Sequence, residues 1–213
     1  MQRDLFDIHT HNPKSESTNI YSVRLGIEPI PNGKVCSAGV HPWDIGKVDY
    51  QQQISTLNNA DIVAVGECGL DYSISLDRDI QKSVFEQHIK IAKERDLPII
   101  IHSVKALVDV IKMLKNSDIN TAIFHSFIGS AEQAKEIIRQ GWYLSLGPRS
   151  LQSSRCREII KTADLSSIFL ESDESREDIL EVYKDVAELR NTTLDELKHS
   201  IKQNYIKIFE SRI

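Results

Sequence analysis

The stretch Leu5-Phe6-Asp7-Ile8-His9-Thr10-His11-Asn12-Pro13 decides between two α/β folds open to this chain. Its first half is a short β-rich run, and its second half is polar and rich in histidine. An open doubly wound sheet usually has a glycine-rich turn after its first strand. Because no such turn follows this run, the stretch favours a (β/α)8 barrel over the open sheet.

Similar β-rich runs recur along the chain, with segments of helical spacing between them. Strands are expected at residues 5–9, 35–41, 62–67, 98–102, 121–125, 142–146 and 168–173, with a weaker one at 19–25. From the third run onward the strand starts are spaced like βα units of a parallel sheet. The pattern predicts a TIM-type (β/α)8 barrel that forms a single domain over residues 1–213. The segment 12–18 is too short and polar for a helix, so a trimmed first βα unit is expected.

Helices are expected where apolar residues recur at helical spacing and where capping boxes occur. In segment 78–95, residues including Ile80, Val84 and Phe85 form one apolar face. Ser130 with Gln133, and Thr193 with Glu196, have the spacing of capping boxes that begin helices.

Composition excludes several classes of protein. The chain has 213 residues, with 26 Lys and Arg against 31 Asp and Glu, a net charge of −5, so it lacks a general basic coat for nucleic acid. No apolar run reaches the length of a membrane span, and Met1–Asp7 lacks the apolar core of a secretion signal. Three cysteines without a C-x-x-C pair predict reduced thiols and a cytoplasmic protein.

Histidines and acids gather at the ends of the expected strands. In a barrel the carboxyl ends of all strands meet at one mouth, where active sites lie. Side chains there converge although they are far apart in the sequence. The residues in question are His9, His41, Glu67, His102, His125 and Asp173, with His11 two residues after His9.

These residue types predict a metal-dependent hydrolase. His9 and His11 share a face and can bind one metal ion that Asp173 completes, while Asp7 can orient an imidazole from behind. His102 and His125 can hold a second ion. Two such ions clamp a phosphoryl centre and supply hydroxide at neutral pH.

Glu67 and Asp173 are the expected catalytic acids. Glu67 has two oxygens and can bridge both ions, and Asp173 can take the proton from the attacking water. Histidine ligands suit Zn, and carboxylate with hydroxide suits Mn or Mg, so the metal identity stays open. The expected cofactors are therefore two divalent ions, Zn, Mn or Mg.

Other polar residues have simpler interpretations. His88 borders an apolar helix face and is expected in the core, and His199 is expected on the surface. Cys68 is expected in the core, and Gly66-Glu67-Cys68-Gly69 is interpreted as a tight turn. In the acidic run 171–181 only Asp173 is a site candidate.

Taken together, the motifs resemble those of the TatD family of metal-dependent deoxyribonucleases, in the family's order and over nearly the whole chain. The motifs are Phe6-Asp7-Ile8-His9-Thr10-His11, Gly39-Val40-His41-Pro42, Gly66-Glu67-Cys68-Gly69-Leu70-Asp71-Tyr72, Pro98 through His102, His125-Ser126-Phe127-Ile128-Gly129-Ser130 and Glu171-Ser172-Asp173. The resemblance implies a distorted barrel of the amidohydrolase type. It implies six metal ligands, His9, His11, Glu67, His102, His125 and Asp173, with Glu67 bridging.

The resemblance also implies a substrate role for His41, which would contact the scissile phosphate. The chain is shorter than typical members, after the first strand and after Asp173. It has Val104 where the family often has an arginine, with Lys105 next. Lys105 and Arg149 are kept as further candidates for substrate binding.

Three functions remain in competition. The first is a two-metal phosphodiesterase acting on DNA ends, a 3′-5′ exonuclease that favours single strands and needs neither a membrane nor an obligate protein partner. The second is a hydrolase of another ester or amide, such as a misacylated-tRNA deacylase, because the same water can attack a carbonyl. The third is a metal-binding scaffold without catalysis, against which the intact Asp173 argues.

Overall fold

In the part of the chain that the structure describes, eight strands lie in one sheet in the order of the sequence, β1 through β8. The computed structural model describes residues 4–15, 17–175 and 178–212. The strands are β1 Phe6–Thr10, β2 Thr18–Arg24, β3 Cys36–Gly39, β4 Ala64–Asp71, β5 Ile99–Val104, β6 Ala122–Phe124, β7 Tyr143–Leu146 and β8 Ile168–Leu170. All eight expected strands are confirmed, including the weaker run near residue 19.

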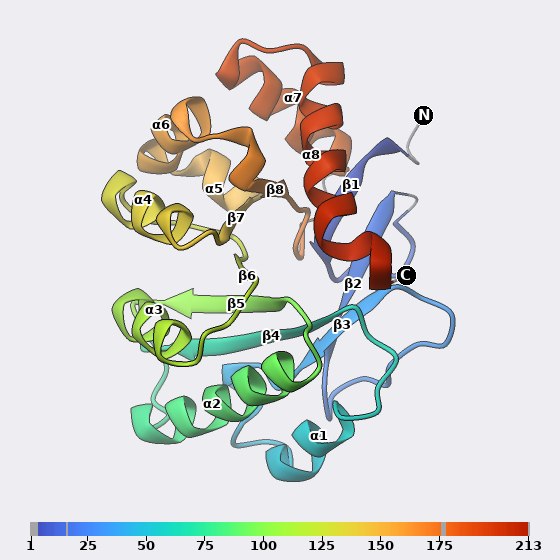
Figure 1. Ribbon diagram of the computed structural model, residues 1–213, viewed down its shortest axis with the longest axis vertical. Helices are drawn as coiled ribbons and strands as arrows, with labels where there is room; N and C mark the ends of the chain where they lie inside the picture. Colours follow the sequence, from blue (N-terminus) through green and yellow to red (C-terminus); the bar gives the residue numbers. More distant parts are fainter. Residues whose placement is uncertain (1–3, 16, 176–177, 213) are drawn as a thin grey trace. The chain divides into compact units, whose positions relative to one another are not determined.

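Helices separate the strands from β3 onward (Figure 1). They are α1 Tyr50–Thr56, α2 Arg78–Glu94, α3 Leu107–Asn116, α4 Ala131–Arg139, α5 Pro148–Gln152, α6 Ser154–Thr162, α7 Ile179–Arg190 and α8 Leu194–Phe209. The described residues between β1 and β2 contain no helix, which confirms the trimmed first unit, and those between β2 and β3 contain none either. In the described part of the chain, no helix combines the length and the apolar character that crossing a membrane requires.

The chain forms two compact units. The central unit covers Ser22–Ile123, with β3 to β5 and α1 to α3. The flanking unit covers Met1–Tyr21 and Phe124–Ile213, with β1, β7, β8 and α4 to α8. The single domain expected over residues 1–213 stays a prediction.

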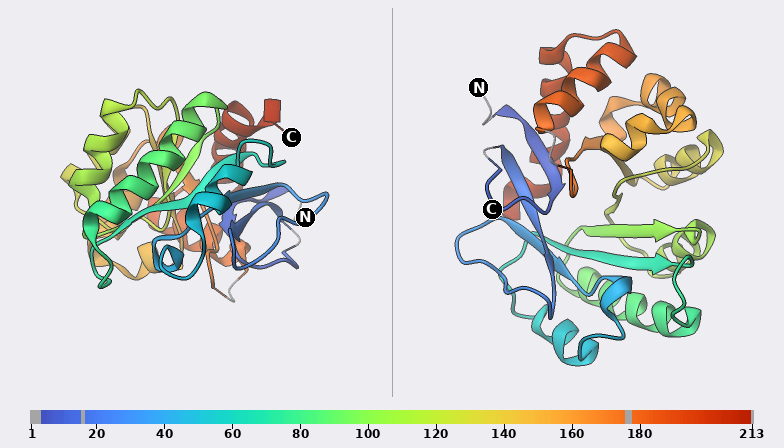
Figure 2. Two further views of the ribbon diagram at one scale, coloured as in Figure 1. Left: turned by 90° about the horizontal axis from the view of Figure 1, so that it is seen from below. Right: turned by 180° about the vertical axis from the view of Figure 1, so that it is seen from behind.

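The core of the central unit lies between α2 and β4, which run side by side in Figures 1 and 2. Val84 and Phe85 are buried, as predicted, but Ile80 is 43% exposed, so its place in the apolar face is wrong. Gln81 takes the inward position in this first turn of α2. Its amide is fully buried and hydrogen-bonds to the backbone N–H and C=O of Asp71.

The tight turn expected at residues 66–69 is also wrong, because β4 continues as a strand to Asp71. Gly66 and Gly69 have φ of 135° and 145°, and a Cβ atom on either would overlap the carbonyl oxygen of Ile100 or His102 on β5. These glycines therefore allow a close approach of two strands, rather than a turn. The register of β4 against β5 shifts between Val65 and Cys68, which marks a bulge.

The flanking unit is built around β1, β7 and β8. β8 pairs with β7 in parallel, and Asp173 forms a parallel bridge with Thr10 at the end of β1. α8 packs on β1 and β8, and Phe209 contacts the ring of Phe169 there. Both predicted capping boxes are present, at the start of α4 and of α8.

His88 is a core residue, as the sequence indicated. It is fully buried on α2, where Nδ1 lies 2.8 Å from the carbonyl oxygen of Val84 and Nε2 accepts from the backbone N–H of Val40 at 3.0 Å. These partners assign the proton to Nδ1. Burial lowers the pKa of His88 to about 4, so the ring is neutral at physiological pH.

The free energy of unfolding should fall on acidification because of His88. The unfolded chain binds a proton here below its ordinary pKa of 6.5, whereas the folded chain does so only near pH 4. The neutral ring's contribution is complete above pH 6.5 and declines by about 3 kcal/mol as the pH falls towards 4. An NMR titration of the His88 ring measures this directly, and a midpoint at or above 6.5 would contradict it.

Replacing Gly69 with alanine should destabilise the protein. The new Cβ would overlap the His102 carbonyl, and the positive φ adds strain. The free energy of unfolding is therefore expected to fall by at least about 2 kcal/mol. Urea unfolding measures it. Gly33→Ala is the matched control, because Gly33 also has positive φ, 72°, but a Cβ there meets nothing within 4 Å. Equal losses in the two variants would show that strand approach is not the constraint.

Candidate metal centre

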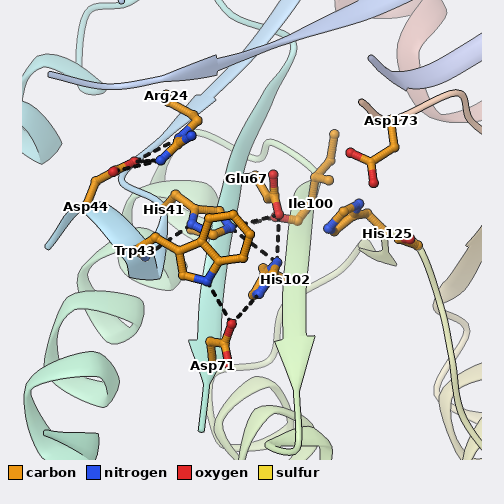
Figure 3. Close-up of polar contacts among 12 residues, drawn as sticks. Arg24, His41, Trp43, Asp44, Glu67, Asp71, Ile100, His102, His125 and Asp173 are labelled. Carbon is orange, nitrogen blue, oxygen red and sulfur yellow. Dashed lines mark hydrogen bonds and ion pairs between the residues drawn. The ribbon is translucent and has the colours of Figure 1, made fainter. Parts of the chain in front are cut away.

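The side chains of His41, Glu67 and His102 meet in the central unit (Figure 3). Glu67 Oε1 lies 2.8 Å from His102 Nδ1 and 3.1 Å from His41 Nε2, and the two ring nitrogens are 3.2 Å apart. All three residues are buried. Two imidazoles and a carboxylate are a set of donors that binds divalent metal ions.

A residue close to His41 in the sequence fixes the orientation of its ring. His41 precedes the short 3₁₀ helix Pro42–Asp44, and its Nδ1 accepts a hydrogen bond from the backbone N–H of Trp43 at 3.1 Å. Burial lowers the pKa of His41, so the ring is held neutral. Since Nδ1 accepts, the proton of the neutral ring lies on Nε2. His41 is therefore a hydrogen-bond donor toward Glu67, and its Nε2 has no lone pair for a metal.

His102 has a carboxylate beside each ring nitrogen, Asp71 and Glu67. His102 Nε2 lies 3.2 Å from Asp71 Oδ2, which also accepts from the indole N–H of Trp43 at 2.8 Å. Burial would raise the pKa of Asp71, but hydrogen bonds from His102, Ser73 and Trp43 outweigh it and hold that pKa well below its usual range. The carboxylate is therefore ionised and can accept the proton of His102 Nε2, just as Glu67 Oε1 can accept one from Nδ1 at 2.8 Å.

The resulting arrangement fits a metal ion. When the His102 proton is on Nε2, the lone pair of Nδ1 faces Glu67 Oε1, and the two atoms are 2.8 Å apart. A divalent cation coordinated by both atoms would stabilise that pair. A carboxylate behind a ligating histidine, as Asp71 is behind His102, is the usual second layer of a metal site.

A second group, in the flanking unit, contains His9, His125 and Asp173. One ligand atom from each lies within 4.8 Å of the others. Asp173 Oδ1 is 3.8 Å from His9 Nε2 and 3.9 Å from His11 Nε2. Figure 3 shows the His125 ring and the Asp173 carboxylate side by side.

These separations suit common ligands of one ion better than direct hydrogen bonds. Two atoms each about 2.1 Å from a tetrahedral zinc ion lie roughly 3.4 Å apart, whereas a hydrogen bond needs about 3.2 Å or less. Two or three imidazoles with one carboxylate form the donor set of many hydrolytic metal sites. The group of His9, His125 and Asp173 in the flanking unit therefore also fits a divalent ion.

The backbone of Asp173 binds the end of β1. Its N–H donates to the carbonyl of His9 at 3.0 Å, and its own carbonyl accepts from His11 N–H at 3.1 Å. Asp173 has φ of 54°, a left-handed conformation that aspartate tolerates better than most residues. The position of this candidate ligand is thus set by its backbone bonds to His9 and His11 and not by its side chain alone.

Asp7 holds the backbone and the hydroxyl of Ser172. Its carboxylate accepts from the Ser172 hydroxyl at 2.6 Å and the Ser172 backbone N–H at 3.0 Å, and from the His9 backbone N–H at 3.4 Å. Burial raises the pKa of Asp7 to about 7. Asp7 therefore ties the residue before Asp173 to β1, and its expected role in orienting an imidazole stays a prediction.

Glu171 and Asp71 are site residues that sequence reasoning missed. Glu171 is fully buried; its Oε1 accepts from the Ser126 backbone N–H at 2.7 Å and lies 3.4 Å from His125 Nδ1. Glu171 sits behind His125 as Asp71 sits behind His102. Both acids stood in the recognised motifs, but an acidic residue next to a ligand is a weak signal without the fold.

The remaining site predictions have mixed outcomes. Lys105 follows β5 and Arg149 lies in α5, and both are exposed. Their roles in substrate binding stay predictions, as does the pairing of His102 with His125. The cysteines are free and buried, as expected, and Cys68 is in the core.

The chain is similar in sequence to known metal-dependent hydrolases. A family described as TatD related DNase matches residues 9–210. The uncharacterized metal-dependent hydrolase YabD of Bacillus subtilis is 33% identical over 166 residues, which cover 70% of this chain and 65% of that protein. Human deoxyribonuclease TATDN3 is 30% identical over 152 residues, 63% of this chain and 55% of that protein. The chain thus spans less than two thirds of the length of either relative.

The fold has been seen before in a crystal structure. YjjV of Escherichia coli, another uncharacterized metal-dependent hydrolase, is 29% identical over 222 residues, 92% of this chain and 84% of that protein. The crystal structure of this TatD homologue superposes with a TM-score of 0.86, at 22% identity over 99% of both chains. The likeness shows that the chain has the expected TIM-type (β/α)8 barrel fold.

Asp71→Asn should weaken metal binding by about 10- to 100-fold, because the amide cannot hold the His102 proton on Nε2 as the ionised carboxylate does. Calorimetric titration of the metal-stripped protein with Zn²⁺ measures the affinity. Asp109→Asn is the matched control: Asp109 is an acid of the same unit that binds Lys82 and Tyr72 instead. Equal affinity in wild type and Asp71→Asn would refute the role of Asp71.

Proposed function

The chain belongs to the TatD related DNase family of metal-dependent hydrolases, and from that premise we propose that it hydrolyses phosphodiester bonds at DNA ends. The observation that carries the proposal is the pair of histidine and carboxylate groups, each backed by a buried acid. The DNA substrate is supported by the family's description and by the name of the human relative.

The proposed metal ligands are His9, His11, His125 and Asp173 in the flanking unit, with Glu67 and His102 in the central unit. Bound divalent ions would polarise the phosphate and lower the pKa of the attacking water. Their identity, Zn, Mn or Mg, and the bridging role of Glu67 are part of the proposal. The metal content of Glu67→Gln tests that role.

The chain's own residues supply the proton transfers and the hydrogen bonds. Asp173 accepts the proton of the attacking water at a carboxylate oxygen. His41 donates from Nε2 to a phosphate oxygen, which agrees with its assigned tautomer. Lys105 and Arg149 add positive charge for the strand, so phosphate is captured locally although the whole chain carries −5.

The proposed reaction is removal of nucleotides from 3′ ends, with a preference for single strands. A net negative chain without a basic coat binds duplex weakly, so a free end that enters the site alone is the better substrate. The proposal places the enzyme in the cytoplasm, and the free thiols of Cys36, Cys68 and Cys156 support that location. The proposal also includes no obligate protein partner.

Asp173→Asn should lower the rate of DNA hydrolysis by at least about 100-fold, because it removes both a ligand and the proton acceptor. A 5′-labelled single-stranded oligonucleotide with Mg²⁺ or Mn²⁺ gives the readout: a ladder of single-nucleotide steps from the 3′ end. Asp195→Asn, an exposed acid on α8, is the matched control.

Chelation of the metal should abolish the same ladder, and added Mn²⁺ or Mg²⁺ should restore it. Full activity after chelation would contradict the proposal. No cleavage by wild type, together with release of amino acid from a charged tRNA, would move the substrate to the ester alternative.

A further inference from the structure

Trp43 is a large aromatic side chain left exposed beside the His41 and His102 rings. Its side chain is 41% exposed. Single exposed apolar residues are common and need no explanation. Trp43 differs because the central unit holds it in place from several directions.

The polar edge of the indole is anchored. Its N–H donates to Asp71 Oδ2 at 2.8 Å, the same oxygen that faces His102 Nε2. The indole lies with its centroid 4.6 Å from the His41 ring and 5.8 Å from the His102 ring, crossing them at 73° and 74° (Figure 3). The ring is therefore fixed against the two histidines of the cluster.

The short helix that carries Trp43 is anchored as well. Arg24 on β2 donates two hydrogen bonds to the buried Asp44 carboxylate, at 2.8 and 2.7 Å. The same guanidinium lies 6.0 Å from the Trp43 ring centroid. The Trp43 side chain therefore has little conformational freedom left to lose. Stacking of a ligand on it costs little side-chain entropy.

From this geometry we infer that Trp43 is the stacking platform for a nucleobase of the substrate, next to the phosphate that His41 contacts. This inference rests on the proposed function. A base must be unpaired to lie on an indole, so the platform selects single-stranded or frayed ends. It tolerates any sequence, because every base has a π face.

Two substitutions separate stacking from support of the cluster. Trp43→Leu removes both the ring and its hydrogen bond to Asp71, whereas Trp43→Phe keeps a ring and loses only the hydrogen bond. The substrates are two single-stranded oligonucleotides of equal length, one intact and one whose 3′-terminal nucleotide lacks its base.

Trp43→Leu should lower kcat/KM for the intact oligonucleotide about 5- to 150-fold, the loss of one base stack. The ratio of kcat/KM for the intact to the abasic oligonucleotide should collapse in Trp43→Leu and persist in Trp43→Phe. Equal losses on both substrates would overturn the inference and make Trp43 a support for Asp71 and His102. A collapsed ratio in Trp43→Phe would overturn it too.

A binding measurement keeps this inference separable from the proposed function. The chain has two tryptophans, and Trp142 is only 4% exposed, so a ligand at the platform acts mainly on the fluorescence of Trp43. With Mg²⁺ present, dAMP should quench wild-type fluorescence, deoxyribose 5-phosphate should not, and Trp43→Phe should lose the dAMP effect.

The two failures have different signatures. Quenching by dAMP without any DNA hydrolysis would refute the proposed function and leave the platform standing. DNA hydrolysis with neither quenching nor dependence on the terminal base would refute the platform alone.

Discussion

β4 lies so close to β5 at Gly66 and Gly69 that neither position has room for a side chain. The local geometry of the central cluster depends on this contact. Glu67 lies between the two glycines, and Gly69 pairs in register with His102. The same approach brings Asp71, two residues further on, to the far ring nitrogen of His102. If β4 and β5 had the ordinary spacing of neighbouring strands, Glu67 would lie farther from His102.

Both units contain buried carboxylates, and each unit positions them through different hydrogen bonds to the backbone. Buried carboxylates such as Glu67 and Glu171 are costly to ionise unless donors or cations surround them. In the central unit, Gln81 holds the backbone of Asp71, and Asp71 then orients His102. In the flanking unit, Asp7 holds Ser172, and the adjacent Asp173 binds β1 through its backbone. The positions of the candidate ligands are therefore set by hydrogen bonds within each unit, which reduces the reorganisation that binding of an ion requires.

Tautomers distinguish residues that the sequence treats alike. His41 and His102 both end a strand run, both are buried, and both contact Glu67. A backbone N–H occupies Nδ1 of His41, so its other nitrogen is a donor. Asp71 faces Nε2 of His102, which leaves Nδ1 as a candidate metal ligand. One residue is thus suited to a phosphate oxygen and the other to a metal. The difference comes from what lies behind each ring.

Local pattern alone predicts the eight strands, the trimmed first unit, the core position of His88 and the strand ends where His9, His102, His125 and Asp173 lie. The alternation of apolar residues, and the polar residues that follow each apolar run, are local signals. They can therefore be read from the sequence without the fold. Three features emerge only in the folded chain: β4 runs through Gly66 and Gly69, Gln81 rather than Ile80 points inward, and Asp71 and Glu171 lie behind candidate ligands. These features depend on the distance between strands and on partners far along the chain, and no local pattern encodes either.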